Sequence, residues 1–241
     1  MNAALLIARR DLADTLHSFT GYVIIAAVLF IDGILFNAFA LGSGAQYSHA
    51  VLQQFFHFCA GTTMIAALLI TMRSFAAEHQ EGTQLLLDQS PISSRTVVLG
   101  KYLAAMGLLA IMTLLTLYMP LLILVNGKIS LGHIAVGYLG MLSLGSACAA
   151  IGIFSSALFR NAVSAAIFGG VIVVGLLLCW LLSEVSDAPF KEMFAYMALF
   201  DKHFTPFKAG RVLTNGLVFY GSLTAIFLML TSTIQEWRSW K

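Results

Sequence analysis

Six long apolar stretches make up most of the 241-residue chain, and they constrain its fold more than any other feature. A helix needs about 20 residues to cross a hydrocarbon core about 30 Å thick, and each stretch is close to that length. Such unbroken runs must pair their backbone groups internally, which favours helices, whereas a membrane barrel shows alternating segments of about 10 residues. The sequence therefore predicts an all-α polytopic membrane protein with spans at Gly21–Leu41, Phe55–Met72, Leu103–Asn126, His133–Phe154, Ala162–Ser183 and Gly216–Ile234.

The composition excludes an ordinary soluble domain. Apolar residues make up 59% of the chain and charged residues 10%, against about 25% charged residues in a typical soluble protein. A soluble fold of this size has no way to hide so much apolar surface. The net charge of +2 and the lack of a basic stripe with interleaved aromatic residues also argue against nucleic-acid binding.

Lysine and arginine residues are distributed unequally between the two sides of the predicted spans. One side carries eight of them: Arg9, Arg10, Arg73, Arg95, Lys101, Arg160, Arg238 and Lys241. The other side carries Lys128 in a short loop, and Lys191, Lys202, Lys208 and Arg211 in the long segment 184–215. Because cytoplasmic loops are enriched in Lys and Arg, this bias predicts that both termini are cytoplasmic.

The segment from Arg73 to Lys101 is the longest charge-bearing stretch between spans on the predicted cytoplasmic side. Its first part is amphipathic, Gly82-Thr83 is able to end one helix and start another, and Pro91 ends the second. Ser93-Ser94 is then suited to cap the following helix. This pattern predicts two short helices bent at a glycine. From the residues alone, a docking surface for another protein and an ordinary solvated loop with an interfacial helix remain equally open.

The sequence has no motif of a catalytic or metal-binding site. It lacks a G-x-x-x-x-G-K-[ST] phosphate loop, an H-E-x-x-H pair and a G-x-S-x-G elbow. Cys59, Cys148 and Cys179 all lie within spans, which is typical of packed thiols, and His49 and His57 lack further ligands. We therefore expect no catalytic residues, no metal and no cofactor in this chain, so that any uphill transport would draw energy from a partner or an ion gradient.

Four motifs occur in order along the six spans. They are Ala8-Arg9-Arg10-Asp11-Leu12, then Glu78-x3-Gly82-Thr83-x3-Leu87-x3-Pro91-Ile92-Ser93 with Gly100-Lys101, then Gly152-x-Phe154-Ser155-Ser156-x4-Asn161, and His203-Phe204-x2-Phe207-x2-Gly210. With this set the chain resembles the permease subunits of type-2 ABC transporters, and most closely the subgroup associated with gliding motility. Asp11, where glutamate is common, and Ala77, often acidic, depart from the usual pattern.

The resemblance implies that residues 73–101 form a coupling segment that docks into a separate ATPase subunit. The residues it assigns to this contact are Glu78, Glu81, Gly82, Thr83, Leu86 and Pro91. ATP and Mg²⁺ would then belong to the partner, and two permeases, identical or homologous, would work with two ATPases in export. The resemblance also implies a bacterial inner-membrane location and one permease domain over residues 1–241, with an amphipathic elbow helix at 1–20 and an interfacial or re-entrant segment at 184–215.

Asp32 is the one carboxylate predicted inside a span. An ionised group at this depth is costly and normally faces protein or water. One interpretation places it on a translocation path. The other, which we favour, is a carboxyl that pairs with a neighbouring helix or is protonated by burial.

Small residues recur four apart in the fifth predicted span, at Ala165 with Gly169 and at Ala166 with Gly170. This spacing lets two helices approach closely. Packing within the chain is one explanation. The family resemblance instead favours a subunit interface formed with the first span.

Two other classes of function fit parts of the same sequence. A membrane anchor or scaffold for an envelope assembly would show a similar cytoplasmic docking segment. An ion-coupled secondary transporter normally shows paired intramembrane charges and inverted repeats, and Asp32 alone supports it only weakly.

Overall fold

The computed structural model describes residues 3–41, 47–82, 93–126, 129–187 and 189–239. Within these ranges the regular structure is helical and contains no strand. Six helical segments there are long and apolar enough to cross a membrane: Phe19–Phe39, Ser48–Glu78, Ser94–Val125, Leu131–Leu158, Ala162–Val185 and Thr214–Trp237. The predicted all-α polytopic fold is confirmed. The second span begins at Ser48 rather than Phe55 and is 31 residues long, one fewer than the longest span.

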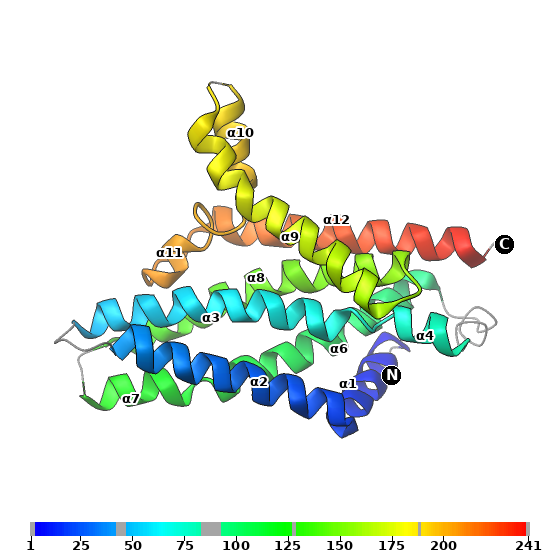
Figure 1. The fold of residues 1–241 in the computed structure, drawn as a ribbon, viewed down its shortest axis with the longest axis horizontal. Helices are drawn as coiled ribbons and strands as arrows, with labels where there is room; N and C mark the ends of the chain where they lie inside the picture. Colours follow the sequence, from blue (N-terminus) through cyan, green and yellow to red (C-terminus); the bar gives the residue numbers. More distant parts are fainter. Residues whose placement is uncertain (1–2, 42–46, 83–92, 127–128, 188, 240–241) are drawn as a thin grey trace.

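The described residues form a bundle of nearly aligned helices with short helices at both ends (Figure 1). The start of α1, the end of α12 and α4 all lie at one end of the bundle, here called the termini face. The elements are α1 (Ala3–His17), α2 (Phe19–Leu35) with the π-helical turn η1 (Phe36–Leu41), α3 (Ser48–Thr71), α4 (Ala76–Glu81), α6 (Ser94–Leu115), α7 (Tyr118–Asn126), α8 (Leu131–Leu158), α9 (Ala162–Val185), α10 (Phe190–Met197), α11 (Thr205–Lys208) and α12 (Thr214–Ser239).

The α8 helix is the central element of the bundle and contacts α3, α6, α9 and α12. Its small residues make this possible, because a side chain at Gly137 would overlap the ring of Phe56 and one at Gly152 would overlap the hydroxyl of Thr71. The space beside Gly145, which has no side chain, is likewise filled by Leu109 of α6. In lipid, helices associate mainly through such close packing, since apolar burial gives little driving force between them.

The third span is interrupted between α6 and α7. The ring of Pro120 displaces the carbonyl of the residue four positions earlier, which is Thr116, and removes one backbone donor. The helix accordingly ends at Leu115 and restarts at Tyr118. The Thr116 hydroxyl donates to the Thr113 carbonyl (2.8 Å) and lies 3.0 Å from the Tyr138 hydroxyl, so the break is tied to α8.

Opposite the termini face, segment 184–215 folds into α10 and α11. The α10 helix stands away from the bundle beside the end of α9 (Figure 1). The α11 helix packs on α8 through Phe207, which fills the space above Gly140. The His203 ring donates through Nε2 to the Tyr196 carbonyl (2.9 Å) and stacks on Phe219, and burial lowers its pKa. The chain therefore anchors this segment on the bundle, while its re-entry into the membrane stays a prediction.

The close approach of α8 to α3 gives a stability prediction. Gly137→Ala places a methyl group against the Phe56 ring and should lower the free energy of unfolding by about 1–3 kcal/mol, the usual cost of overpacking. Gly175→Ala, in α9, is the matched control because no atom lies within 4 Å of the position that its new methyl group would take. We expect the control to keep its thermal midpoint, measured by size-exclusion chromatography of heated protein in detergent. Equal midpoints for both variants would contradict this packing.

Candidate functional site

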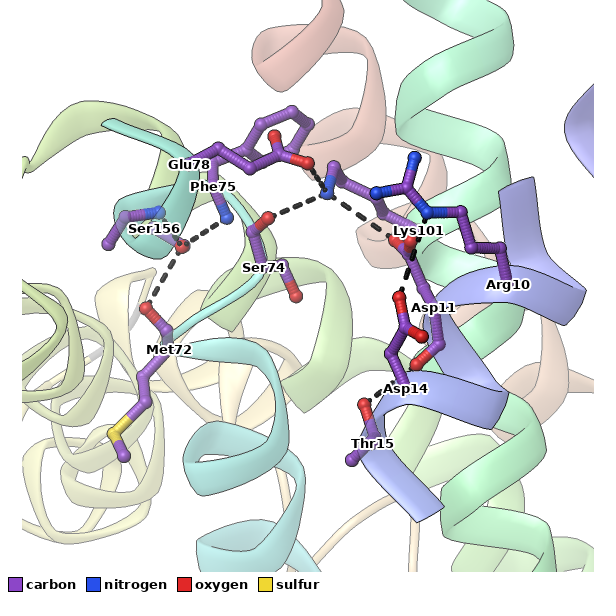
Figure 2. Close-up of polar contacts among 11 residues, drawn as sticks. Arg10, Asp11, Asp14, Thr15, Met72, Ser74, Phe75, Glu78, Lys101 and Ser156 are labelled. Carbon is purple, nitrogen blue, oxygen red and sulfur yellow. Dashed lines mark hydrogen bonds and ion pairs between the residues drawn. The ribbon is translucent and has the colours of Figure 1, made fainter. Parts of the chain in front are cut away.

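The ammonium group of Lys101, on α6, lies at the centre of a polar cluster on the termini face (Figure 2). It donates to Glu78 Oε1 (2.6 Å), to the Ser74 carbonyl (2.7 Å) and to Asp11 Oδ2 (3.4 Å). Three acceptors thus match the three N–H groups of a lysine. Because Asp11 belongs to α1 and Ser74 and Glu78 belong to the α3–α4 region, one side chain joins three segments. We call Lys101, Asp11, Ser74 and Glu78 the lysine cluster.

The lysine cluster is buried, so each of its charges is stabilised by the opposite charge beside it. The Lys101 side chain is 4% exposed, while Glu78 and Asp11 are 23% and 28% exposed. A charge removed from water is tolerated when it is paired and hydrogen-bonded, and losing one partner leaves the other uncompensated. The Phe75 ring adds a cation–π contact, with its centroid 5.0 Å from Nζ. The cluster therefore holds α4 and α1 against α6 as a unit.

Glycine residues let α1 approach α6 closely enough to complete the cluster. A Cβ at Gly100 would lie 2.8 Å from the Ile7 side chain and 3.0 Å from the Ala4 carbonyl. Further along α6, the Leu12 side chain of α1 fills the space beside Gly107. Gly100 therefore provides the close approach and Lys101 the charge, which explains why the two occur side by side.

The start of α4 is fixed to the end of α8 by Ser156. Its hydroxyl accepts from the backbone N–H of Phe75 (2.9 Å) and of Ala76 (3.1 Å), and it donates to the Met72 carbonyl (3.0 Å). Figure 2 shows this serine on the side of α4 opposite Lys101. Phe75 is 3% exposed and packs in a small core with Val98. Two spans, α6 and α8, thus hold the beginning of α4.

The C-terminal end of α4 agrees with the predicted glycine break. Gly82 has a φ of 70°, the left-handed conformation that ends helices and that glycine adopts without strain. Ser93 caps α6 as predicted, because its side chain accepts from the Thr96 N–H (3.4 Å). Thr83, Leu86 and Pro91, together with the predicted second short helix, lie outside the described residues. Glu81 is the last residue of α4.

Among the predicted coupling residues, Glu78 faces the interior of the chain. Its Oε1 contacts Lys101, so in this structure the carboxylate serves to hold α4 in place. The sequence motifs contain Asp11, Lys101 and Ser156, but their spacing does not pair them. The one sequence feature that could have indicated the lysine cluster is a lysine that directly follows a glycine at the start of a span.

Asp32, predicted inside the first span, is 2% exposed on α2. The Thr62 hydroxyl of α3 lies 2.6 Å from its Oδ1 and also lies 2.9 Å from the Cys59 carbonyl. The adjoining cavity of about 10 Å³, lined by Thr63, Thr113 and other residues, has room for about one water molecule. The carboxyl therefore pairs with a neighbouring helix, and a role in a translocation path stays a prediction.

The two small-residue pairs of α9 have different surroundings. Ala165 is fully buried, and a Cβ at Gly169 would lie 2.8 Å from Ser155 Oγ of α8. A Cβ at Gly170 would meet no atom within 4 Å, and Ala166 is partly exposed. One pair is thus used for packing within the chain, and the predicted subunit contact is left to Ala166 and Gly170.

The lysine cluster gives a second stability prediction. Lys101→Met should lower the free energy of unfolding by about 3 kcal/mol, because Glu78 and Asp11 lose their buried counter-charge. Adding Glu78→Gln to this variant should restore part of the loss. The control is Arg95→Gln, which breaks the more exposed pair with Glu236 (3.5 Å) and should cost less than about 1 kcal/mol. Thermal unfolding in detergent measures all three, and a Lys101→Met loss no larger than that of the control would contradict a buried cluster.

Comparison with known proteins agrees with the six-span frame. The sequence profile described as ABC-2 family transporter protein matches residues 13–235, which is nearly the whole chain. Direct comparison with curated proteins gives no match. The profile describes membrane components of ABC transporters, and the six apolar helices agree with that role. The chain therefore belongs to the ABC-2 transporter family, as a membrane-spanning permease subunit.

Proposed function

We propose that this permease exports its substrate with energy from ATP and Mg²⁺ bound by a separate ATPase subunit, which docks at residues 73–101. The observation that carries the proposal is the attachment of α4 to two spans at once, through Lys101 of α6 and Ser156 of α8. A displacement of α4 by a bound ATPase would therefore move these spans rather than bend a free loop.

The surface left on α4 for a partner lies away from the lysine cluster. Gln80 is exposed, whereas Phe75 and Ala76 are buried on the spans. The α4 helix ends at Gly82, and Thr83, Leu86 and Pro91 follow it in the sequence. In this proposal Glu78 sets the position of α4, and residues after it supply most of the contact with the ATPase.

The orientation supported by the charge bias puts the termini face in the cytoplasm, where ATP is available. Arg73 and Arg95 lie near the ends of spans on that face, and α1 lies across α6 through Gly100 as an elbow helix would. We place the protein in a bacterial inner membrane, among the permeases that its motifs resemble in the gliding-motility subgroup.

We infer that two permeases, identical or homologous, assemble through α9 and α2. Only 17% of the α2 span and 22% of the α9 and α12 spans are buried within the chain, against 67% of α8, and the small residues favour α9 over α12. On α9 the exposed side includes Val163 and Ile167 beside the small residues Ala166 and Gly170. Small residues within an exposed apolar face let a second helix approach closely.

The coupling proposal is tested at Gly82. A β-branched residue is strained at a φ of 70°, whereas asparagine tolerates the left-handed region. We expect Gly82→Val to lose stimulation of the cognate ATPase and its co-purification with the tagged permease, and Gly82→Asn to keep both. The amount of each variant inserted in the membrane, measured by immunoblotting, should be equal. If Gly82→Val retains ATPase binding and stimulation, the docking site lies elsewhere; if no ATPase co-purifies with the unmodified chain, a scaffold or an ion-coupled transporter is the better explanation.

The assembly proposal is tested with single cysteines on α9, in a background where Cys59, Cys148 and Cys179 are replaced by alanine. Ala166→Cys and Gly170→Cys should cross-link between chains in native membranes. Ala165→Cys and Val173→Cys should not, because these positions are buried against the bundle. Leu230→Cys, exposed on α12, controls for random collisions. Cross-linking at Leu230→Cys without cross-linking on α9 would place the interface on α12.

A further inference from the structure

A cavity of about 330 Å³ opens beside the lysine cluster, between α1, the end of α3, α4 and α6. Cavities of this size commonly hold small ligands or parts of larger ones. Its rim is formed by the strongly exposed side chains of Arg10 and Asp14, and its inner wall includes the buried Lys101. Figure 2 shows Arg10, Asp14 and Thr15 of α1 facing the segment that carries Ser74 and Glu78.

The charged groups in the cavity wall balance one another. Three are cationic and three are acidic: Arg10, Arg73, Lys101, Asp11, Asp14 and Glu78. Such a wall differs from the purely basic pockets that collect anionic lipid headgroups. A bare anion would meet three carboxylates, and a bare cation would meet three basic side chains. The balance fits a ligand that carries both charges.

Some of these groups keep hydrogen-bonding capacity after the contacts within the chain are made. The Lys101 ammonium is fully used, but Arg73 donates through Nη1 to the Thr20 hydroxyl (3.2 Å) and a guanidinium has five N–H donors. On the acidic side, Glu78 Oε2 is buried without a hydrogen-bond partner among the described residues. Asp14 is 70% exposed and lies 3.6 Å from Arg10. Because Glu78 Oε2 is closed to solvent and Oε1 is used by Lys101, the acceptor that the cavity offers is the exposed Asp14, and the spare donors are on Arg73.

The apolar part of the cavity wall points to a lipid rather than a soluble zwitterion. Ile70 belongs to the end of the second span, and Ala104, Ala105 and Leu108 belong to the third. Arg73, Glu78 and Lys101 lie at the ends of these spans, where headgroups meet the hydrocarbon core, and the other charged residues of the wall lie on α1 beside them. The wall therefore changes from charged to apolar along the spans, as a phospholipid does from its headgroup to its acyl chains.

We propose that this cavity binds the headgroup of a phosphatidylethanolamine-type lipid, with the phosphate against Arg73 and the primary ammonium against Asp14. An ammonium with three N–H groups donates hydrogen bonds to carboxylates, whereas the quaternary ammonium of phosphatidylcholine has no N–H to donate. The cavity should therefore discriminate between two zwitterionic lipids of equal charge. This site is a property of the permease alone and does not depend on the proposed ATPase.

The test is native mass spectrometry of the full-length permease, released from mixed micelles containing equal amounts of phosphatidylethanolamine, phosphatidylcholine and phosphatidylglycerol. We expect phosphatidylethanolamine to be retained about tenfold over phosphatidylcholine, since a hydrogen bond to a charged group is worth that factor or more. Soluble glycerophosphoethanolamine, added in excess, should not displace it, because the acyl chains contribute to binding. Displacement by this soluble headgroup, or retention of all three lipids in equal amounts, would overturn the proposal.

Variants separate this cavity from general lipid binding. Arg73→Gln and Asp14→Asn should each reduce the preference for phosphatidylethanolamine several-fold, and Ala77→Trp should abolish it by filling the cavity without changing a charge. Arg160→Gln is the matched control, because Arg160 is exposed on the same face but outside the cavity wall. A preference that survives Ala77→Trp, or falls equally in Arg160→Gln, would contradict the site. If the cavity variants lose ATPase co-purification while lipid retention is unchanged, the cavity is a protein contact and the lipid proposal is wrong.

Discussion

A single ammonium group at Lys101 determines how the termini face is built. Its three N–H groups reach an acid on α1, a carbonyl after α3 and an acid on α4, and the side chain is almost fully buried. Because a buried charge is tolerated only with its partners in place, these segments must be positioned together. Gly100 and Ser156 support the arrangement from both sides, one by letting α1 approach and the other by holding the start of α4.

The bundle combines a well-packed centre with weakly packed edges. Its centre is α8, where glycines accept Phe56, Leu109 and Thr71 from neighbouring helices. At the edges α2 and α9 bury little of their surface within the chain. A transporter that changes shape needs this division, because packed helices move as a unit and loosely held helices change neighbours. The lysine cluster lies where the packed centre meets the segment proposed to receive the ATPase.

Much of the fold follows from the sequence, because span length and apolar continuity report directly on the bilayer. The glycine break at Gly82 and the cap at Ser93 are also local features, and residue type alone predicts both. The site depends on contacts between distant residues, and spacing does not reveal them. Asp11 and Lys101 are 90 residues apart, and the spacing of four that marks Ala165 with Gly169 does not say which face of α9 meets α8. Glu78 illustrates the same limit, since its inward direction follows from Lys101.

The separation of Asp11 from Lys101 has a consequence for how the protein is made. Synthesis proceeds from the N-terminus, so α1 leaves the ribosome long before α6, and its acid has no counter-charge until the third span is in place. Until then the amphipathic α1 has only the membrane surface to lie on. Completion of the lysine cluster therefore marks the moment at which α1, the end of the second span and the third span become one unit. A chain halted after its second span would expose an unpaired carboxylate and an undocked helix, the kind of surface that quality-control proteases recognise.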